Sequence, residues 1–537
     1  MNGAQAIVKC LENEGVEMIF GYPGVAICPF YDAVLDSSVR TILIRTEQNA
    51  AHAASGMARV TGKVGVCAVT SGPGATNLIT GIATAYADSI PLVCITGQVN
   101  SELIGSDVFQ EADITGAAES FVKYSYLVKN AEEIPQIFKE AFYIANTGRK
   151  GPVLIDVPID VQNAIVKKFK YPESVSLRSY KPTVKGHSVQ IKKVMAELEK
   201  AKRPVICAGG GVLLSQAQEN LREFAAKYRV PVVSTMMGIG AMKTQDPLYY
   251  GMVGNNGAAA ANRAMNEADL IIMVGARVAD RAVNQPDIIT KGKVLVHMDV
   301  DPAEIGKNAG PTIPLVGDAK HIFEEMMTID ITYDHEEWIS VMDGYRESMK
   351  LKRNPDPAYV DPAEFIRRLS EKMDNDGIYV ADVGQNQIWS CKNHIVKDGT
   401  FMTSGGMGTM GYSIPAAMGA KLGAPGRQSV AVCGDGSFQM SMMELATMCQ
   451  HDVPVKVIVM SNKYLGMVRQ YQHKTYNDRY SVVDLSGSPD LSKIAEAYGI
   501  PFIRVHNMEE ADAAIDRLLE KNETVLMECI IDPMDLV

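Results

Sequence analysis

The chain has 537 residues, of which 47% are apolar and 21% charged, and it carries a net charge of −11. This composition is that of a folded globular protein of about three domains rather than a disordered one. The acidic balance and the lack of a basic stripe disfavour nucleic acid as a partner, and no run of about 18 apolar residues predicts a membrane-spanning helix.

The N-terminal residues and the cysteine pattern predict a cytoplasmic protein. The N-terminal residues show no basic stretch followed by an apolar block, so we predict no secretory signal. The nine cysteines are scattered and include no CxxC pair, which disfavours zinc and disulfide frameworks. We therefore expect free thiols in a reducing cytoplasm.

Apolar, β-branched runs that end in Gly, Ser, Thr or Asp recur along the whole chain and predict buried strands. In chain order they are 41–47, 64–72, 91–97, 152–158, 203–211, 230–235, 269–276, 293–300, 377–384, 428–436, 454–462 and 524–532. Helical stretches such as 221–229 and 491–499 lie between them. This alternation predicts parallel sheets that are covered by helices.

Two stretches, 167–188 and 331–362, lack this rhythm, and we interpret both as linkers although the second is partly helical. The predicted fold class is therefore α/β, with three doubly wound parallel-sheet domains over 1–166, 189–330 and 361–537. Open parallel sheets bind ligands at the carboxyl ends of their strands. The residues just after each predicted strand are thus the candidates for function.

The most informative segment joins two predicted strands, one ending in Gly434-Asp435-Gly436-Ser437 and the next ending before Asn462. The spacing between Asp435 and Asn462 is about that of one strand–helix–strand unit, so both side chains should emerge at one sheet edge. A carboxylate and an amide oxygen suit Mg²⁺, which also takes phosphate oxygens, and the glycines let backbone N–H groups approach a diphosphate. A plain turn would explain the glycines alone, but the pair of residues favours a metal–diphosphate site.

This motif resembles that of thiamine-diphosphate (ThDP) enzymes, in which GDG is followed by Asn after such an interval. Further segments, in colinear order over nearly the whole chain, resemble the catalytic subunit of acetohydroxyacid (acetolactate) synthases: 21–32, 45–77, 96–116, 148–158, 382–390, 404–423 and 462–472. The resemblance implies a pyrimidine-binding first domain, a central domain and a diphosphate-binding last domain. It also implies that pyruvate is decarboxylated and its hydroxyethyl unit passed to a second 2-oxo acid, as in branched-chain amino-acid biosynthesis.

Glu47 follows the first predicted strand and begins a helix, where an acidic residue would ordinarily complement the helix dipole. The resemblance implies instead that Glu47 contacts N1′ of the ThDP aminopyrimidine and promotes loss of the thiazolium C2 proton. It further implies that Phe109 and Gln110 face the active site of a partner subunit, with Gln110 near the substrate. Pro23, in the GYPG segment, is implied as a cofactor contact.

The segment 404–411 places four glycines beside two methionines, which a tight turn with core methionines would also explain. The resemblance implies that the Gly408 carbonyl accepts from the 4′-amino group of ThDP and that Met410 props the cofactor in a V shape. The other implied ThDP contacts are Gly384, Gln385, Asn386, Gly434, Gly436, Ser437 and Met467. The implied Mg²⁺ ligands are Asp435, Asn462 and the backbone carbonyl of Tyr464.

The central domain carries glycines after several predicted strands, which allow close approach of an extended dinucleotide. It has no GxGxxG motif, which disfavours an ordinary nicotinamide site. The resemblance implies FAD with little redox role, and the alternative is a relic domain with an empty or ADP-like site. The implied FAD-site residues are Arg149, Gly210, Gly211, Gly275, Arg277, Asp299 and Asp318.

Several positions depart from the family pattern and leave the acceptor substrate open. Val25 replaces the usual glycine after GYPG, and Tyr471 replaces the usual tryptophan. The alternative function is a related ThDP carboligase or decarboxylase with a different acceptor, whereas Glu47 and Asp435 argue against a non-catalytic nucleotide-binding scaffold. The implied partners are small 2-oxo acids and further copies of the chain in a dimer or tetramer, and a separate regulatory subunit stays open.

Overall fold

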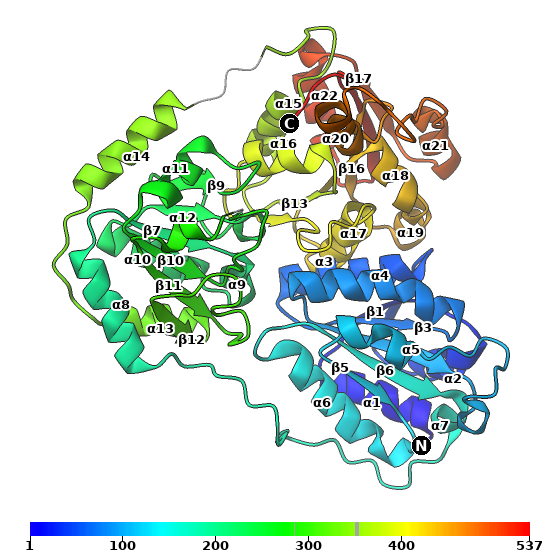
Figure 1. The fold of residues 1–537 in the computed structure, drawn as a ribbon. Helices are drawn as coiled ribbons and strands as arrows, with labels where there is room; N and C mark the ends of the chain where they lie inside the picture. The colour runs from blue at the N-terminus through cyan, green and yellow to red at the C-terminus, as the bar shows by residue number, and fades with distance from the viewer. Residues whose placement is uncertain (284, 350–353) are drawn as a thin grey trace.

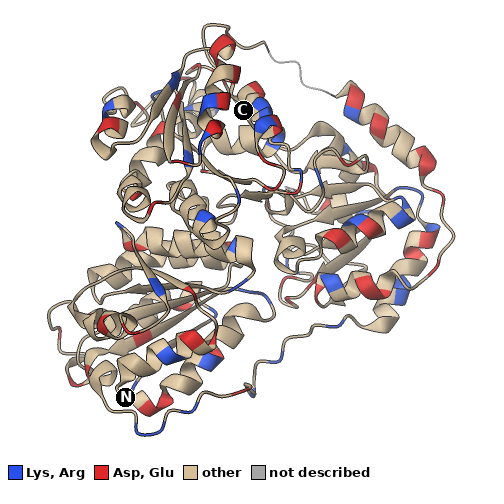
Figure 2. Ribbon diagram, turned by 180° about the vertical axis from the view of Figure 1, so that it is seen from behind, with Lys and Arg blue, Asp and Glu red and all other residues tan. Residues whose placement is uncertain are grey.

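A computed structural model of the protein describes residues 1–283, 285–349 and 354–537. It contains three α/β units, each built on a six-stranded parallel sheet with helices on its faces (Figure 1). This confirms the predicted fold class. Within the described residues, no helix combines the length and the apolar character needed to cross a membrane. Acidic and basic side chains are interspersed over the outer helices rather than gathered into a stripe of one sign (Figure 2).

The first unit has the strand order β2-β1-β3-β4-β6-β5. Its strands are β1 (Met18–Tyr22), β2 (Arg40–Leu43), β3 (Gly65–Val69), β4 (Leu92–Gln98), β5 (Tyr124–Leu127) and β6 (Pro152–Pro158). Its helices are α1 (Gly3–Asn13), α2 (Cys28–Val34), α3 (Glu47–Thr61), α4 (Pro73–Asp88), α5 (Ile114–Ala118), α6 (Ile134–Asn146) and α7 (Ile159–Asn163), with short 3-10 turns η1 (Val25–Ile27), η2 (Ser101–Leu103), η3 (Glu119–Phe121) and η4 (Ala131–Glu133).

The central unit has the order β12-β11-β10-β7-β8-β9. Its strands are β7 (Pro204–Ala208), β8 (Val232–Ser234), β9 (Tyr249–Met252), β10 (Leu270–Val274), β11 (Val294–Asp299) and β12 (Ile313–Val316). Its helices are α8 (Ser188–Lys200), α9 (Gly210–Leu214), α10 (Gln218–Tyr228), α11 (Ala259–Glu267), α12 (Asp287–Thr290), α13 (Ala319–Met326) and α14 (Glu336–Ser348), with the 3-10 turn η5 (Met236–Gly238). Counted along the unit, this is the order 3-2-1-4-5-6 of dinucleotide-binding sheets, in which the ligand crevice lies between the first and fourth strands, here β7 and β10.

The third unit has the order β14-β13-β15-β16-β18-β17, which repeats the connectivity of the first. Its strands are β13 (Ile378–Ala381), β14 (Thr400–Met402), β15 (Ser429–Gly434), β16 (Lys456–Ser461), β17 (Phe502–Val505) and β18 (Val525–Ile530). Its helices are α15 (Pro362–Lys372), α16 (Gln385–Asn393), α17 (Ser413–Gly423), α18 (Asp435–Ser441), α19 (Glu444–His451), α20 (Gly466–Tyr476), α21 (Leu491–Tyr498) and α22 (Met508–Glu520).

Local sequence explains where the principal helices begin and end. Asp361 caps α15 by accepting from the backbone N–H of Ala363, and Pro362 occupies the first helical position, where its missing N–H costs nothing. Helix α3 ends at Gly62, which has φ +70, the left-handed conformation that glycine adopts without strain. The Gly62 conformation thus sets the end of α3 at Thr61.

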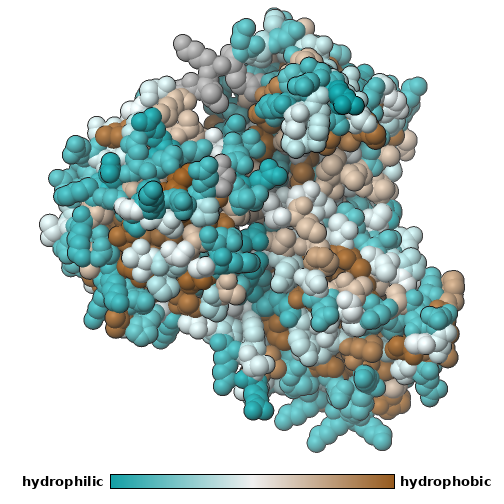
Figure 3. Space-filling model, viewed as in Figure 1, coloured by the Kyte–Doolittle hydropathy of each residue, from teal (hydrophilic) through white to brown (hydrophobic). Residues whose placement is uncertain are grey.

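The first and third units share one apolar core through the contact of α3 with α17. A Cβ atom on Gly56 would lie 1.9 Å from the Ala416 carbonyl oxygen, and one on Gly419 would lie 1.9 Å from the Ala53 oxygen. Glycine at these two positions therefore lets the helix backbones touch. The space-filling view shows apolar residues gathered where the two units meet (Figure 3).

Helix α14 lies inside the stretch 331–362 that the sequence presented as a linker. Its Trp338, Ile339 and Met342 are buried, and the Trp338 indole donates to the Pro204 carbonyl over 3.1 Å. The helix therefore packs on the central unit, and we propose that this unit extends past the predicted boundary at 330 to Ser348. The part of the predicted linker at 350–353 lies outside the described residues.

Candidate active site

One cavity of about 680 Å³ runs between the central and third units and is lined by the carboxyl ends of their strands. This cavity is lined both by residues predicted to bind FAD and by residues predicted to bind ThDP and Mg²⁺. From the central side and the loop before β6 they are Arg149, Gly210, Gly211, Gly275, Arg277, Asp299 and Asp318. From the third unit they are Gly384, Gln385, Asn386, Gly408, Met410, Gly434, Asp435, Gly436, Ser437, Asn462, Tyr464 and Met467.

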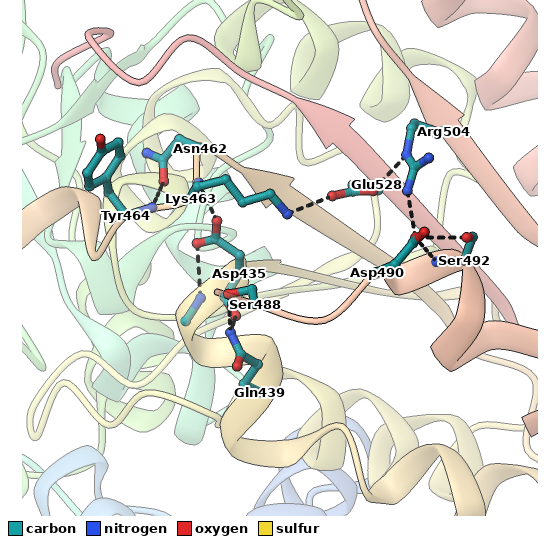
Figure 4. Close-up of polar contacts among 11 residues, drawn as sticks. Asp435, Gln439, Asn462, Lys463, Tyr464, Ser488, Asp490, Ser492, Arg504 and Glu528 are labelled. Atoms are coloured by element: carbon teal, nitrogen blue, oxygen red, sulfur yellow. Dashed lines mark hydrogen bonds and ion pairs between the residues drawn. The ribbon is translucent and has the colours of Figure 1, made fainter. Parts of the chain in front are cut away.

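Asp435 and Asn462 lie at the ends of the adjacent strands β15 and β16, where Gly434 is paired with Met460. The Asp435 carboxylate accepts from the backbone N–H groups of Gly436, at 3.0 Å, and Lys463, at 2.6 Å (Figure 4). The Asn462 amide oxygen accepts from the Tyr464 N–H at 3.0 Å. The spacing argument thus places the two side chains at one edge of the sheet, as expected.

The donor set at this edge fits a divalent cation. Two hydrogen bonds occupy only half of the roughly four acceptor positions of the Asp435 carboxylate. Desolvation raises the Asp435 pKa to about 6, and an adjacent cation would favour the charged form. A carboxylate and an amide oxygen suit an ion that completes its shell with phosphate oxygens and water, as Mg²⁺ does.

The backbone of Lys463 lies beside Asp435 and Asn462, but its ammonium group does not. Its ammonium group points away from Asp435 and lies 3.4 Å from the buried Glu528 carboxylate, which also accepts from Arg504 at 2.9 Å (Figure 4). The residue adopts φ +62, an uncommon conformation for a residue with a side chain. The turn thereby offers its backbone to Asp435 and keeps a competing cation out of the site.

The N-termini of α16 and α18 face the same cavity and can bind a diphosphate through backbone N–H groups. Gly384 precedes α16 with φ +139, a conformation that favours glycine. A Cβ atom on Gly436 would lie 2.6 Å from Leu465 and 3.5 Å from the methyl carbon of Met410. Met410 therefore reaches over the turn that carries Gly436. The family resemblance implies that Met410 contacts the cofactor.

The central end of the cavity is a glycine cradle between β7 and β10. A Cβ atom on Gly211 would lie 2.6 Å from the Gly275 Cα, and Gly275 itself has φ +53. The two strand-end loops touch through their backbones at the point where a dinucleotide crosses such a sheet. The cradle fits an extended dinucleotide, in keeping with the strand order.

The charged residues at this end already make contacts within the protein. Arg149 lies 2.9 Å from Glu304 and 3.3 Å from Asp301. Asp318 caps α13 by accepting from the Lys320 N–H at 3.0 Å. Burial raises the Asp299 pKa to about 6. A ligand at this end would therefore meet a preformed charge network rather than free side chains.

Four predicted residues of the first unit, Pro23, Glu47, Phe109 and Gln110, do not line this cavity, and Glu47 and Gln110 lie against the turn 70–74 after β3. A Cβ atom on Gly74 would lie 3.3 Å from the Glu47 carboxylate, and one on Gly72 would lie 2.9 Å from the Gln110 carbonyl oxygen. The Asn77 amide donates to Glu47 at 3.1 Å. These residues form a second, separate half of the candidate site.

This first-unit half is open to solvent. Phe109 is 87% exposed and Val25 76% exposed, although both are apolar. The loop that carries Phe109 is internally braced, because the Glu111 carboxylate accepts from the backbone N–H of Val108 at 3.2 Å and also from that of Gly105. Gln110 has φ +61, which for a glutamine is strained and fixes the turn. A braced loop with an exposed aromatic residue is suited to contact another molecule.

Sequence reasoning missed several residues of the cavity. Gly466 is one, because a Cβ atom there would lie 2.0 Å from the Gln385 amide oxygen. Met237, of the central unit, packs against Gly405 of the third and so forms part of the wall between the two ends. The segment NKYLG, in which Gly466 follows Asn462, was a usable signal for the first residue, but no local signal pointed to Met237.

Comparisons with known proteins agree with the three-part architecture. Models described as thiamine pyrophosphate enzyme N-terminal TPP binding domain, central domain and C-terminal TPP binding domain match residues 1–117, 191–326 and 382–529. A probable acetolactate synthase large subunit of Methanocaldococcus jannaschii is 44% identical, with 100% of this chain and 93% of the relative covered. The acetolactate synthase large subunit of Haemophilus influenzae is 41% identical (100% and 96% covered), and the isozyme 3 large subunit of Escherichia coli is 40% identical (99% and 95% covered).

Proposed function

This chain belongs to the acetolactate synthase large-subunit family of thiamine-diphosphate enzymes, and from that membership we propose a role for each part of its candidate site. It is a ThDP-dependent enzyme of the acetolactate synthase type. We propose pyruvate as the donor and a second small 2-oxo acid as the acceptor, in branched-chain amino-acid biosynthesis. The observation that carries the proposal is the cavity in which the Asp435–Asn462 edge and the N-termini of α16 and α18 converge.

The third unit would hold the diphosphate and its metal. Asp435, Asn462 and the Tyr464 carbonyl would bind Mg²⁺, while the N-termini of α16 and α18 would donate backbone hydrogen bonds to the diphosphate. Met410 and the Gly408 carbonyl would orient the aminopyrimidine end. When bound, ThDP supplies the electron sink that 2-oxo acid decarboxylation needs.

Glu47 would supply the acid–base group of the reaction. Its carboxyl would face the aminopyrimidine ring nitrogen and exchange a proton there, with the Asn77 amide fixing its orientation. Gln110 and Phe109 would close the site and exclude water around the reacting carbon. Because these residues lie outside the cavity of their own chain, the proposal requires a second copy to bring the two halves together.

The protein is therefore expected to be a dimer at least, with isologous contacts that cover Phe109 and Val25 of each chain. Tyr471 and Val482 of the third unit are 58% and 93% exposed and would lie in the same interface. Light scattering under assay conditions should give twice the chain mass or a multiple of it. An active monomer would exclude the shared site.

Val25 is proposed to tune the acceptor. It adds a branched side chain beside the turn 70–74, where a Cβ on the neighbouring Gly24 would lie 2.5 Å from Thr70. A methyl-sized change in an apolar pocket shifts selectivity by about 1–3 kcal/mol. Val25→Gly is therefore expected to change the ratio of products from mixed pyruvate and 2-oxobutyrate by about tenfold with little loss of total turnover. An unchanged ratio, measured by mass spectrometry, would remove Val25 from the acceptor site.

We also propose FAD at the central end of the cavity, supported by the glycine cradle and the 3-2-1-4-5-6 strand order. Gly210, Gly211 and Gly275 would allow the dinucleotide backbone to approach, and Arg277, Asp299 and Asp318 line the space around it. A separate regulatory subunit is a further proposal, because the relatives are named large subunits.

A further inference from the structure

The N-terminus of α3, which carries Glu47, contacts helix α19 of the third unit, where Glu444 supplies a buried carboxylate and Gln450 and His451 bind the segment before the helix. Glu444, the first residue of α19, has no exposed surface. Its carboxylate accepts from the Arg45 backbone N–H at 3.0 Å and 3.3 Å to its two oxygens, and from the Asn49 amide at 2.9 Å. Thr447 of the same helix donates to it at 2.7 Å. The Arg45 N–H and the Asn49 amide can only donate to Glu444, whereas the Thr447 hydroxyl can also accept.

The two first-unit residues that Glu444 contacts, Arg45 and Asn49, lie on either side of Glu47 in the sequence. Thr46, at the cap position of α3, makes no side-chain hydrogen bond to the helix. Glu444 does not cap a backbone N–H of α3, but it fixes the residues on both sides of its first turn, and a negative charge there complements the helix dipole. The rest of α3 is fixed differently, through its backbone contact with α17 and a buried hydrogen bond of 3.2 Å between Ser55 and Tyr412.

We propose that Glu444 is a positioning residue that sets the direction of the Glu47 carboxylate for cofactor activation. This inference rests on the proposed role of Glu47. A displacement of about 1 Å at a reacting group can cost 10²-fold in rate. The hydrogen bonds that Glu444 accepts from Arg45 and Asn49, called the Glu444 clamp below, restrain the chain on both sides of Glu47 and so limit such a displacement. Helix α19, which begins at Glu444, follows directly on α18, which begins at the proposed metal ligand Asp435. Glu444 therefore connects the metal-binding segment of a chain to Glu47, which in the proposed dimer enters the site of the other copy.

The test compares Glu444→Gln, Ser55→Ala, Glu47→Gln and the double variant of the two glutamates, each as the full chain with ThDP and Mg²⁺. Glu444→Gln keeps the shape but removes the negative charge and one of the two acceptor oxygens, so the second hydrogen bond from the Arg45 N–H is lost. Three quantities are measured: the exchange rate of the thiazolium C2 proton in D₂O, ThDP affinity by calorimetry, and the melting temperature without cofactor.

We expect Glu444→Gln to slow C2 exchange by about 10- to 100-fold with ThDP affinity within about threefold of the wild type. Ser55→Ala removes another buried contact of α3 and should leave the exchange rate unchanged. In the Glu47→Gln background, Glu444→Gln should add no further loss. If Glu444→Gln does not fold, Asn49→Ala removes one arm of the clamp and should slow exchange by about threefold to tenfold.

Normal exchange in Glu444→Gln together with slow exchange in Glu47→Gln would overturn the positioning role alone. Equal slowing by Ser55→Ala, or multiplying losses in the double variant, would show that Glu444 only holds the units together and would also overturn it. Normal exchange in Glu47→Gln would instead contradict the proposed role of Glu47 itself.

Discussion

Glu47→Gln is expected to lower turnover of pyruvate by two orders of magnitude or more while the protein still folds and binds ThDP. The amide keeps the size of the side chain and its contact with Asn77, but it cannot exchange a proton with the cofactor ring. Positioned acid–base groups contribute about 10²- to 10⁴-fold to rates. Steady-state CO₂ release, with ThDP affinity measured in parallel, checks both halves of this expectation.

A matched control is available in the same unit. Glu17 is an exposed carboxylate at the amino end of β1, on the edge of the sheet opposite Pro23, and it pairs with Lys63 at the surface. Glu17→Gln should leave both turnover and ThDP affinity at wild-type values. Near-normal turnover in Glu47→Gln would remove Glu47 from the mechanism.

Asp435→Ala is expected to weaken ThDP binding in the presence of Mg²⁺ by about 100-fold or more. The substitution removes the anionic metal ligand and leaves the diphosphate charge without its counter-ion. Loss of even an outer contact of a bound metal typically costs 10- to 100-fold in affinity, so loss of a direct ligand should cost at least as much. Isothermal calorimetry with ThDP and Mg²⁺ measures the change.

Two further variants separate charge from structure. Asp435→Asn keeps an oxygen for one of the Gly436 and Lys463 N–H groups and should lose most of the affinity with a smaller fall in melting temperature than Asp435→Ala. Asp490→Asn changes an exposed carboxylate of the same unit that caps α21 and pairs with Arg504, and it should bind ThDP normally (Figure 4). Unchanged affinity in Asp435→Ala would show that the metal lies elsewhere.

Much of the fold could be predicted because the inner strands of parallel sheets are buried on both faces and read as continuous apolar runs. Each of the predicted runs overlaps a strand of the structure. The strands that the sequence did not predict are mostly those at sheet edges, β5, β9, β12, β14 and β17, where burial is incomplete on one side. β1 is internal, but Gly21 interrupts its apolar run.

Helix α14 shows why the boundary of the central unit is hard to predict. Its buried face is made by Trp338, Ile339 and Met342 alone, and the charged residues between them gave the segment the character of a linker. Contacts with residues far away in the sequence, such as Pro204 and Glu267, support the proposal that the helix belongs to the central unit.

For the candidate site, local motifs predicted which residues approach one another within a unit but not across units. Asp435 and Asn462 could be paired because adjacent parallel strands end at one edge. That the two predicted ligand sites open into one cavity follows from the packing of the central unit on the third, which no spacing reveals. The clamp of Glu444 on Arg45 and Asn49 was missed for the same reason, since a buried glutamate on a helix has no local signature.

The product formed from pyruvate alone tests the central claim most directly. The full chain, supplied with ThDP and Mg²⁺, should release one CO₂ for every two pyruvate molecules consumed and form 2-acetolactate, identified by NMR before and after acid decarboxylation to acetoin. No product should form when ThDP is omitted and bound cofactor has been removed. Acetaldehyde as the sole product would contradict the carboligase assignment in favour of a decarboxylase, and pyruvate left intact would contradict both.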